Sequence, residues 1–172
     1  TFLVPGLKIK LVDKRTGQLQ QDEFLSRGGL KDLVEYESKG DSVTKVITFN
    51  GIETFEEKVP VHGKMTTVER ECTVDIALRW VAGYETSVSS FVNTVPTPDG
   101  GTHLSGFERA LTRAINDKLL PGTKKLAKLA KQDKDRAVKD DVHEGLVVAI
   151  KVTFPEPQFR GQTKRELGTP AI

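Results

Sequence analysis

The chain is poor in the features on which several protein classes depend. Its 172 residues include a single cysteine, Cys72, which excludes an intrachain disulfide framework and a cysteine-based zinc knuckle and fits a reducing compartment. No apolar run approaches the ~18 residues of a membrane-spanning helix. Residues 1–6 also lack the basic and apolar segments of a secretory signal. An initiator Met is missing, so we expect a fragment or a processed chain.

No charge of one sign dominates, because 26 basic residues face 24 acidic ones. The balance is uneven along the chain, since residues 118–139 hold eight basic side chains against two acidic ones. This segment contains no aromatic residue, so stacking on nucleic-acid bases is not expected there. Two interpretations stay open: a solvated helix face, and a surface that contacts nucleic-acid phosphates.

Alternation of apolar and polar residues predicts strands over 7–12, 43–49, 72–81, 86–92 and 145–154. The last of these is partly apolar on its second face, which is typical of a central strand covered on both sides. Asn50-Gly51 is a hairpin-type turn signal. Residues 52–70 are polar and poorly periodic, which favours a long hairpin tip or a mobile loop.

Two amphipathic patterns predict helices. The first follows Gly28-Gly29 and ends at Gly40-Asp41. The second opens with Ser105 and Glu108 at capping-box spacing and ends at 121–122. Its apolar stripe recurs every four residues, at 107, 111, 115 and 119. The order of the elements indicates an α+β domain with a mixed sheet and helices packed mainly on one face.

Two loops have the chemistry to hold an anion. Residues 99–103, Asp-Gly-Gly-Thr-His, form either a flexible turn or a backbone nest at a helix N-terminus, without the spacing of a P-loop or a dinucleotide site. His103 fits a hydrogen-bonding role better than that of a base. Residues 161–164, Gly-Gln-Thr-Lys, offer an amide, a hydroxyl and an ammonium, which match the several oxygens of a phosphate. The alternative is a solvated lysine.

No reaction follows from the residues alone. The three histidines, His62, His103 and His143, are widely separated, and no metal cluster is apparent. No acid–base pair and no nucleophile with an orienting group stands out. The residues by themselves therefore indicate an α+β domain with loops suited to phosphate contact.

Three stretches taken together resemble one protein family. They read SFVNT and TPDGGTHLSGF over 90–94 and 97–107, ALTR over 110–113, and DVHEGL with PEPQFRGQTK over 141–146 and 155–164. In this order they resemble the transducer domain of the B subunit of bacterial type IIA DNA topoisomerases, which are DNA gyrase and topoisomerase IV. The sequence LGTPA over 167–171 is more similar to the topoisomerase IV-like subunits of actinobacteria.

The resemblance implies one transducer domain over 1–172, with the fold of the second domain of ribosomal protein S5 and a left-handed βαβ crossover. A GHKL-type ATP-binding domain would precede it, and a toprim domain that binds Mg²⁺ would follow. This fragment alone would hold no metal and would neither hydrolyse ATP nor cleave DNA. The implied partners are a DNA duplex, the topoisomerase A subunit and a second B subunit that pairs on ATP binding. The implied location is the cytoplasm, away from membranes.

The resemblance also assigns residues. Gln162 and Lys164 match the Gln-Thr-Lys loop that reaches the γ-phosphate of ATP, with Lys164 as the catalytic cation of a family without a P-loop lysine. Lys124, Lys125 and Lys128 are candidates for DNA contact. His143 and Arg165-Glu166 depart from the residues of many members, which leaves the charge contacts near the loop open. A stand-alone RNA- or ribosome-binding module and an interaction domain with an inert loop are the alternatives.

Overall fold

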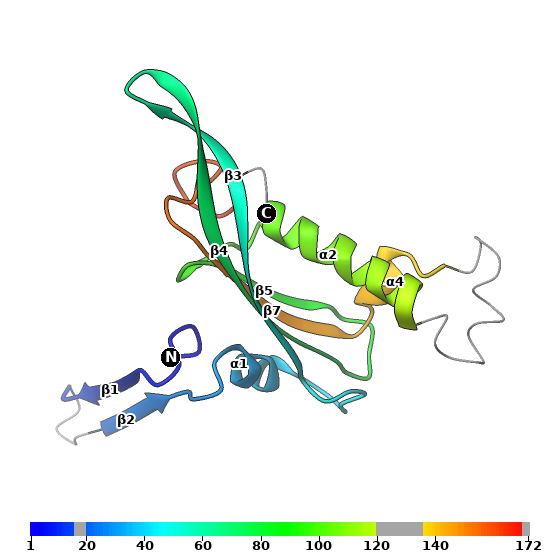
Figure 1. Cartoon of the computed structure of the whole chain (residues 1–172). Helices are drawn as coiled ribbons and strands as arrows, with labels where there is room; N and C mark the ends of the chain where they lie inside the picture. The colour runs from blue at the N-terminus through cyan, green and yellow to red at the C-terminus, as the bar shows by residue number, and fades with distance from the viewer. Residues whose placement is uncertain (16–19, 120–135, 170–172) are drawn as a thin grey trace.

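A computed structural model describes residues 1–15, 20–119 and 136–169 of the chain. The described strands form a main sheet of five and a separate sheet of two. The small sheet pairs β1 (Lys8–Asp13) with β2 (Gln20–Leu25) in antiparallel register. It lies apart from the main sheet, near the amino terminus (Figure 1). β1 confirms the predicted strand over 7–12, whereas β2 has no counterpart in the prediction.

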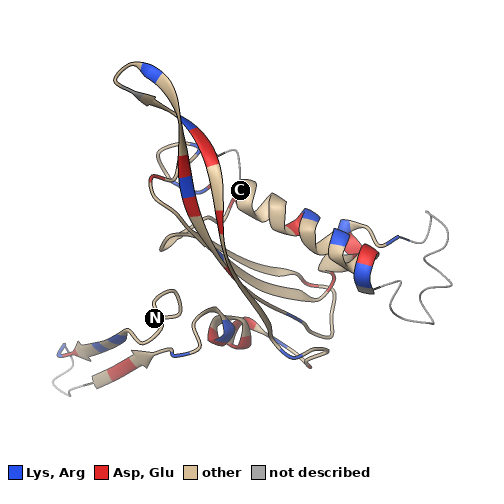
Figure 2. Cartoon of the chain, in the orientation of Figure 1, with Lys and Arg blue, Asp and Glu red and all other residues tan. Residues whose placement is uncertain are grey.

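The main sheet is mixed, and its central strand is the one that the sequence marks most clearly. The order is β3 (Ile47–Val61), β4 (Lys64–Trp80), β7 (Leu146–Thr153), β5 (Ser87–Val92) and β6 (Val95–Pro96). β7 runs antiparallel to β4 and parallel to β5. Most of its side chains are buried, and Lys151 is its one charged residue. Figure 2 shows that the charged residues of the main sheet gather on the long β3–β4 hairpin, whereas the strands next to α2 are largely tan. The prediction of a central strand covered on both sides is confirmed.

Helices cover both faces of this sheet, unequally. α1 (Leu30–Glu37) packs Leu30, Leu33 and Val34 on one face, against Ala77, Val147 and Ala149. α2 (Thr102–Ala114) packs Phe107 on the other face, against Leu78, Val148 and Ile150. The short α4 (Lys139–His143) lies beside α2, where the carbonyl of Val142 accepts a bond from Trp80 Nε1 at 2.9 Å. The helices thus lie mainly on one face, as predicted, and α1 covers the second apolar face of β7.

β5 and β7 are parallel neighbours, and the chain between them passes through α2 and α4. This is a βαβ connection, as the resemblance implies, and its left hand stays a prediction. The predicted strand over 86–92 is confirmed by β5.

The strands β3 and β4 form one long hairpin that rises past the rest of the sheet (Figure 1). The predicted turn at Asn50-Gly51 is wrong: both residues lie inside β3, where Asn50 pairs with Asp75 and donates to its carboxylate at 2.6 Å. The turn comes at His62-Gly63, with φ of 49° and 79°. Residues 52–70 form the arms and tip of this hairpin. Of the two interpretations of this stretch, the hairpin tip is confirmed and the mobile loop is not.

α2 begins earlier than predicted and without the predicted capping box. Its first residue is Thr102, and the Ser105 amide already donates to the Gly101 carbonyl at 3.0 Å. Glu108 pairs with Lys139 of α4 at 2.7 Å, so its carboxylate serves a tertiary contact. After Ala114 the helix widens into a π-helical turn, Ile115–Leu119. The predicted stop at 121–122 lies outside the described residues.

Candidate phosphate-binding loop

The chain after β7 forms a loop whose two arms are bonded to each other at its base. Gly168 N–H donates to the Gln158 carbonyl at 2.8 Å, and Arg160 N–H donates to the Glu166 carbonyl at 2.9 Å. Phe159 and Leu167 bridge between these bonds. We call residues 158–169 the Gln-Thr-Lys loop, with its tip at 161–165. Leu167 and Thr169 are fully buried, whereas all five residues of the tip are exposed.

This loop is fastened to the start of α2, so the two candidate anion-binding motifs lie side by side. Leu167 N–H donates to the Gly100 carbonyl at 3.0 Å, and the Leu167 carbonyl accepts from Thr102 N–H at 3.3 Å. Gly101 has φ of 137°, and a Cβ there would lie 2.5 Å from the Leu167 oxygen. A glycine is therefore needed at 101 both for the backbone angle and for the close approach.

Gln162 and Lys164, the predicted γ-phosphate ligands, both lie on the exposed tip. Lys164 has φ of 55°, in the left-handed region, and its N–H closes a turn with the Gly161 carbonyl at 3.4 Å. Its ammonium nitrogen lies 5.9 Å from the centroid of the Phe159 ring. Among the described residues, Lys164 forms no ion pair with a carboxylate. Its charge is thus available to an anionic ligand.

The charges beside Lys164 are paired. Arg165 donates two bonds to Asp99, at 2.7 and 2.9 Å, and this bidentate contact holds the pKa of the Asp99 carboxyl below its usual value. Arg160 pairs with Glu166 at 2.7 Å. The departure at Arg165-Glu166 therefore supplies two intramolecular contacts that brace the loop. No local pattern signals the first of them, because Asp99 and Arg165 meet only through the fold.

His103 lies in the first turn of α2, and its side chain is buried. Its Nε2 shares a hydrogen bond with Ser90 Oγ at 2.6 Å, and Ser90 Oγ contacts Thr97 Oγ1 at 2.7 Å. Burial lowers the pKa of His103 to about 4, so the ring is neutral at physiological pH. The hydrogen-bonding role expected for His103 is confirmed.

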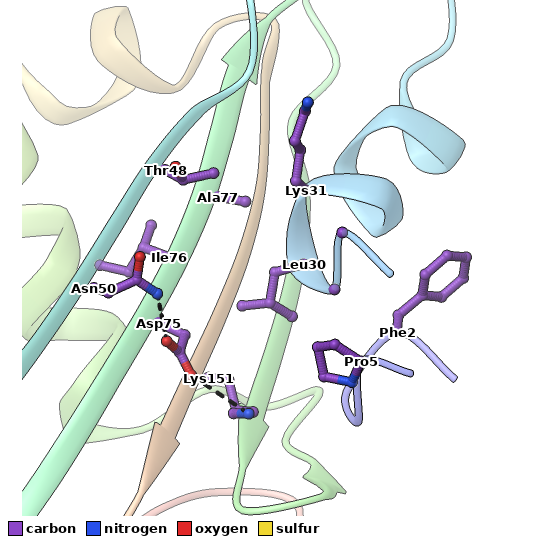
Figure 3. Close-up of a pocket in the computed structure, with 12 residues that line it drawn as sticks. Phe2, Pro5, Leu30, Lys31, Thr48, Asn50, Asp75, Ile76, Ala77 and Lys151 are labelled. Carbon is purple, nitrogen blue, oxygen red and sulfur yellow. Dashed lines mark hydrogen bonds and ion pairs between the residues drawn. The ribbon is translucent and has the colours of Figure 1, made fainter. Parts of the chain in front are cut away.

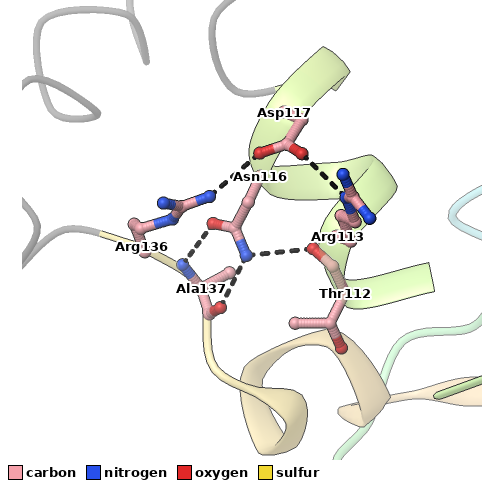
Figure 4. A network of polar contacts seen from close by, with 6 residues as sticks. All are labelled: Thr112, Arg113, Asn116, Asp117, Arg136 and Ala137. Carbon is pink, nitrogen blue, oxygen red and sulfur yellow. Dashed lines mark hydrogen bonds and ion pairs between the residues drawn. The ribbon is translucent and has the colours of Figure 1, made fainter. Parts of the chain in front are cut away.

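The candidate DNA ligands Lys124, Lys125 and Lys128 lie outside the described residues. The described residues on either side of 120–135 meet in a polar network (Figure 4). Asn116 bonds both the N–H and the carbonyl of Ala137 at 2.9 Å, and Asp117 pairs with Arg136 at 2.9 Å and Arg113 at 3.4 Å. The π-helical turn is thus bonded to Arg136 and Ala137.

A second polar cluster lies in a hollow between α1 and the sheet (Figure 3). There the Asp75 carboxylate accepts from Asn50 at 2.6 Å and lies 3.4 Å from the Lys151 ammonium. None of the predicted site residues lies in it. Its three members stand on three different strands, so no local sequence pattern could have grouped them.

Neither a metal site nor a membrane span is found in the part of the chain that the structure describes. Within residues 1–15, 20–119 and 136–169, no three His, Cys, Asp or Glu side chains are placed to hold a metal ion. Over the same residues, no helix is long and apolar enough to cross a membrane.

Comparison with known proteins shows the family of the chain. The sequence model of DNA gyrase B matches residues 29–172. The chain belongs to the DNA gyrase B family. The DNA gyrase B protein of Streptococcus pyogenes serotype M1 is 37% identical over 171 residues, and that of Treponema pallidum is 39% identical over 173. These alignments cover 99% of this chain but only 23% and 24% of the relatives, so the chain spans about a quarter of their length.

Solved structures agree with this assignment. The 43K ATPase domain of Thermus thermophilus gyrase B has a TM-score of 0.70 and 28% identity, covering 98% of this chain and 40% of that one. The topoisomerase IV ATP-binding domain of Francisella tularensis, at 20% identity over 97% of this chain and 39% of that one, shares the fold with a TM-score of 0.62. The α+β fold predicted for the chain is that of the gyrase B transducer region. The comparisons give no support to the RNA-binding alternative, and the actinobacterial topoisomerase IV-like subtype stays a prediction.

Proposed function

We propose that this chain is the transducer segment of an ATP-dependent type IIA DNA topoisomerase. It would carry the state of bound nucleotide from a GHKL-type domain to the DNA gate. The observation that carries the proposal is the Gln-Thr-Lys loop, which presents the Lys164 ammonium and the amide of Gln162 to solvent on a braced base. Membership in the gyrase B family supports the proposal that this loop extends toward the bound nucleotide.

The chemistry of the tip fits the terminal phosphate of ATP. Its γ-phosphate oxygens carry concentrated negative charge, and the Lys164 ammonium supplies a point charge to them. Gln162 adds a neutral donor. Because ADP lacks these oxygens, contact with the tip distinguishes ATP from ADP and lets hydrolysis release the loop.

The wider assembly belongs to the proposal as well. The intact B subunit would work in the cytoplasm with the topoisomerase A subunit, a DNA duplex and a second B subunit that pairs on ATP binding. Its Mg²⁺ is assigned to residues outside this segment. Lys124, Lys125 and Lys128 are proposed to contact DNA phosphates. Reversing their charge would then weaken the salt-dependent stimulation of ATP hydrolysis by DNA.

The test of the proposed function is the Lys164→Ala variant of the intact B subunit. Removing one preorganised donor of this kind typically lowers kcat by about 10²–10³-fold. We expect that loss with ADP binding retained. Lys10→Ala, which removes an exposed lysine from the distant β1, is the matched control and should turn over ATP normally. Normal turnover by Lys164→Ala would refute the proposal.

A further inference from the structure

A buried carboxylate in the outer half of the β3–β4 hairpin faces the Gln-Thr-Lys loop. β4 has β7 as a neighbour only from Thr73 to Trp80, so the arms beyond Cys72 leave the sheet as a two-stranded hairpin. Within these arms Glu57 is 7% exposed, whereas its neighbour Glu56 is exposed. A buried carboxylate requires charged or hydrogen-bonding partners, because its desolvation is costly.

The partners of Glu57 come from both the hairpin and the loop. Arg70, on the opposite arm, places its Nε 3.4 Å from Glu57 Oε2 and also pairs with Glu156. Gln158 Nε2 donates to the other oxygen, Oε1, at 3.0 Å. Two of these contacts therefore cross from the hairpin to the segment that leads into the loop.

Gln158 lies at the base of the loop, so its contact with Glu57 can affect the position of the loop. Its N–H donates to Thr169 Oγ1 at 3.0 Å, and its carbonyl accepts from Gly168 N–H at 2.8 Å. It thus joins the two arms of the loop at the base, with its side chain directed to Glu57. Displacing Gln158 would move the base from which the tip projects.

We propose that Glu57, oriented by Arg70, is a positioning residue for the γ-phosphate loop. By binding the Gln158 side chain it fixes the direction in which Gln162 and Lys164 project. Among the described residues, the Gln158 side chain donates the one hydrogen bond that the buried Glu57 carboxylate accepts, so hairpin and loop are coupled. This inference rests on the proposed function, since it names what holds the loop for its task.

The test uses reciprocal variants of the intact B subunit. Gln158→Glu places two carboxylates against each other, and Glu57→Gln removes the charge that the Gln158 amide binds. We expect each to lower kcat for ATP about tenfold and to weaken binding of a non-hydrolysable ATP analogue, with ADP affinity unchanged. The double variant E57Q/Q158E restores a donor and an acceptor in exchanged places and should recover most of the activity. Glu56→Gln, the same change at the exposed neighbour, should behave like the unchanged protein.

The outcomes separate the inference from the proposed function. Normal turnover by both single variants beside an inactive Lys164→Ala would overturn the positioning role and leave the proposed function standing. An equal loss of ADP and ATP-analogue affinity, with no recovery in the double variant, would reduce Glu57 to a structural role and also overturn it. Normal turnover by Lys164→Ala would remove the proposed function itself.

Discussion

The base and the tip of the Gln-Thr-Lys loop are built from opposite kinds of residues. At the base, Leu167 and Thr169 are fully buried and their backbones bond to the start of α2. The Thr169 hydroxyl also accepts a bond from the Gln158 N–H. At the tip, residues 161–165 are exposed, and Lys164 carries its charge without a carboxylate partner among the described residues. The difference indicates that folding energy is concentrated at the base and ligand chemistry at the tip.

Alanine substitution of two glycines, one at the base and one at the tip, should show the largest difference in stability between these regions. Gly101→Ala would push a Cβ to 2.5 Å from the Leu167 oxygen at a φ of 137°, which we expect to lower the free energy of unfolding by about 3 kcal/mol. At the tip, a Cβ added at Gly161 would have no atom within 4 Å. Gly161→Ala should therefore lower the free energy of unfolding by only about 1 kcal/mol, because of the positive φ at this position. Urea unfolding of both variants measures the difference. Equal losses would contradict the division between base and tip.

The pH dependence of stability tests the buried hydrogen-bond network of His103, Ser90 and Thr97. His103 has a pKa of about 4 in the folded chain and about 6.5 when unfolded. Between these values the unfolded chain binds more protons, so stability is full above pH 6.5 and falls as the pH drops toward 4. We expect a loss of about 2 kcal/mol from pH 7 to pH 5. Unfolding of a His103→Gln variant at both pH values should show a flatter dependence, and an unchanged slope would assign the effect elsewhere.

A smaller effect on stability is expected from the ion pair between Asp99 and Arg165. Arg165 holds the pKa of Asp99 below its ordinary value. The pair therefore stabilises the folded chain at pH values above the pKa that Asp99 has when unfolded. This stabilisation is lost as the pH falls through the pKa that Asp99 has in the folded chain. Arg165→Ala should return the carboxyl titration of Asp99 to its ordinary range, followed by NMR. An Asp99 titration that does not move would show that Arg165 does not brace the loop.

The sequence predicts the elements whose patterns are local. The apolar faces of β7 and the first part of the helical stripe, Phe107 and Leu111 of α2, are such patterns, and both are found. Asn50-Gly51 misleads because cross-strand pairing with β4 continues through it, overriding its turn preference. The capping box at Ser105 fails because the Leu167 carbonyl meets the start of α2 from a distant part of the chain.

The candidate site divides in the same way. Gln162 and Lys164 are recognisable because they form one short motif. The bracing by Asp99 and the positioning by Glu57 join residues that are 66 and 101 positions apart from their partners. Glu57 reads as one more acidic residue of a polar stretch, and only the folded hairpin buries it.

The most direct test of the division between base and tip is one variant measured in two ways. Lys164→Ala should leave the free energy of unfolding within about 0.5 kcal/mol of the original chain, as for an exposed side chain. In the intact B subunit it should weaken a non-hydrolysable ATP analogue about tenfold or more and leave ADP affinity unchanged. A clear loss of stability, or equal affinities of the variant and the unchanged protein for the ATP analogue, would contradict the account.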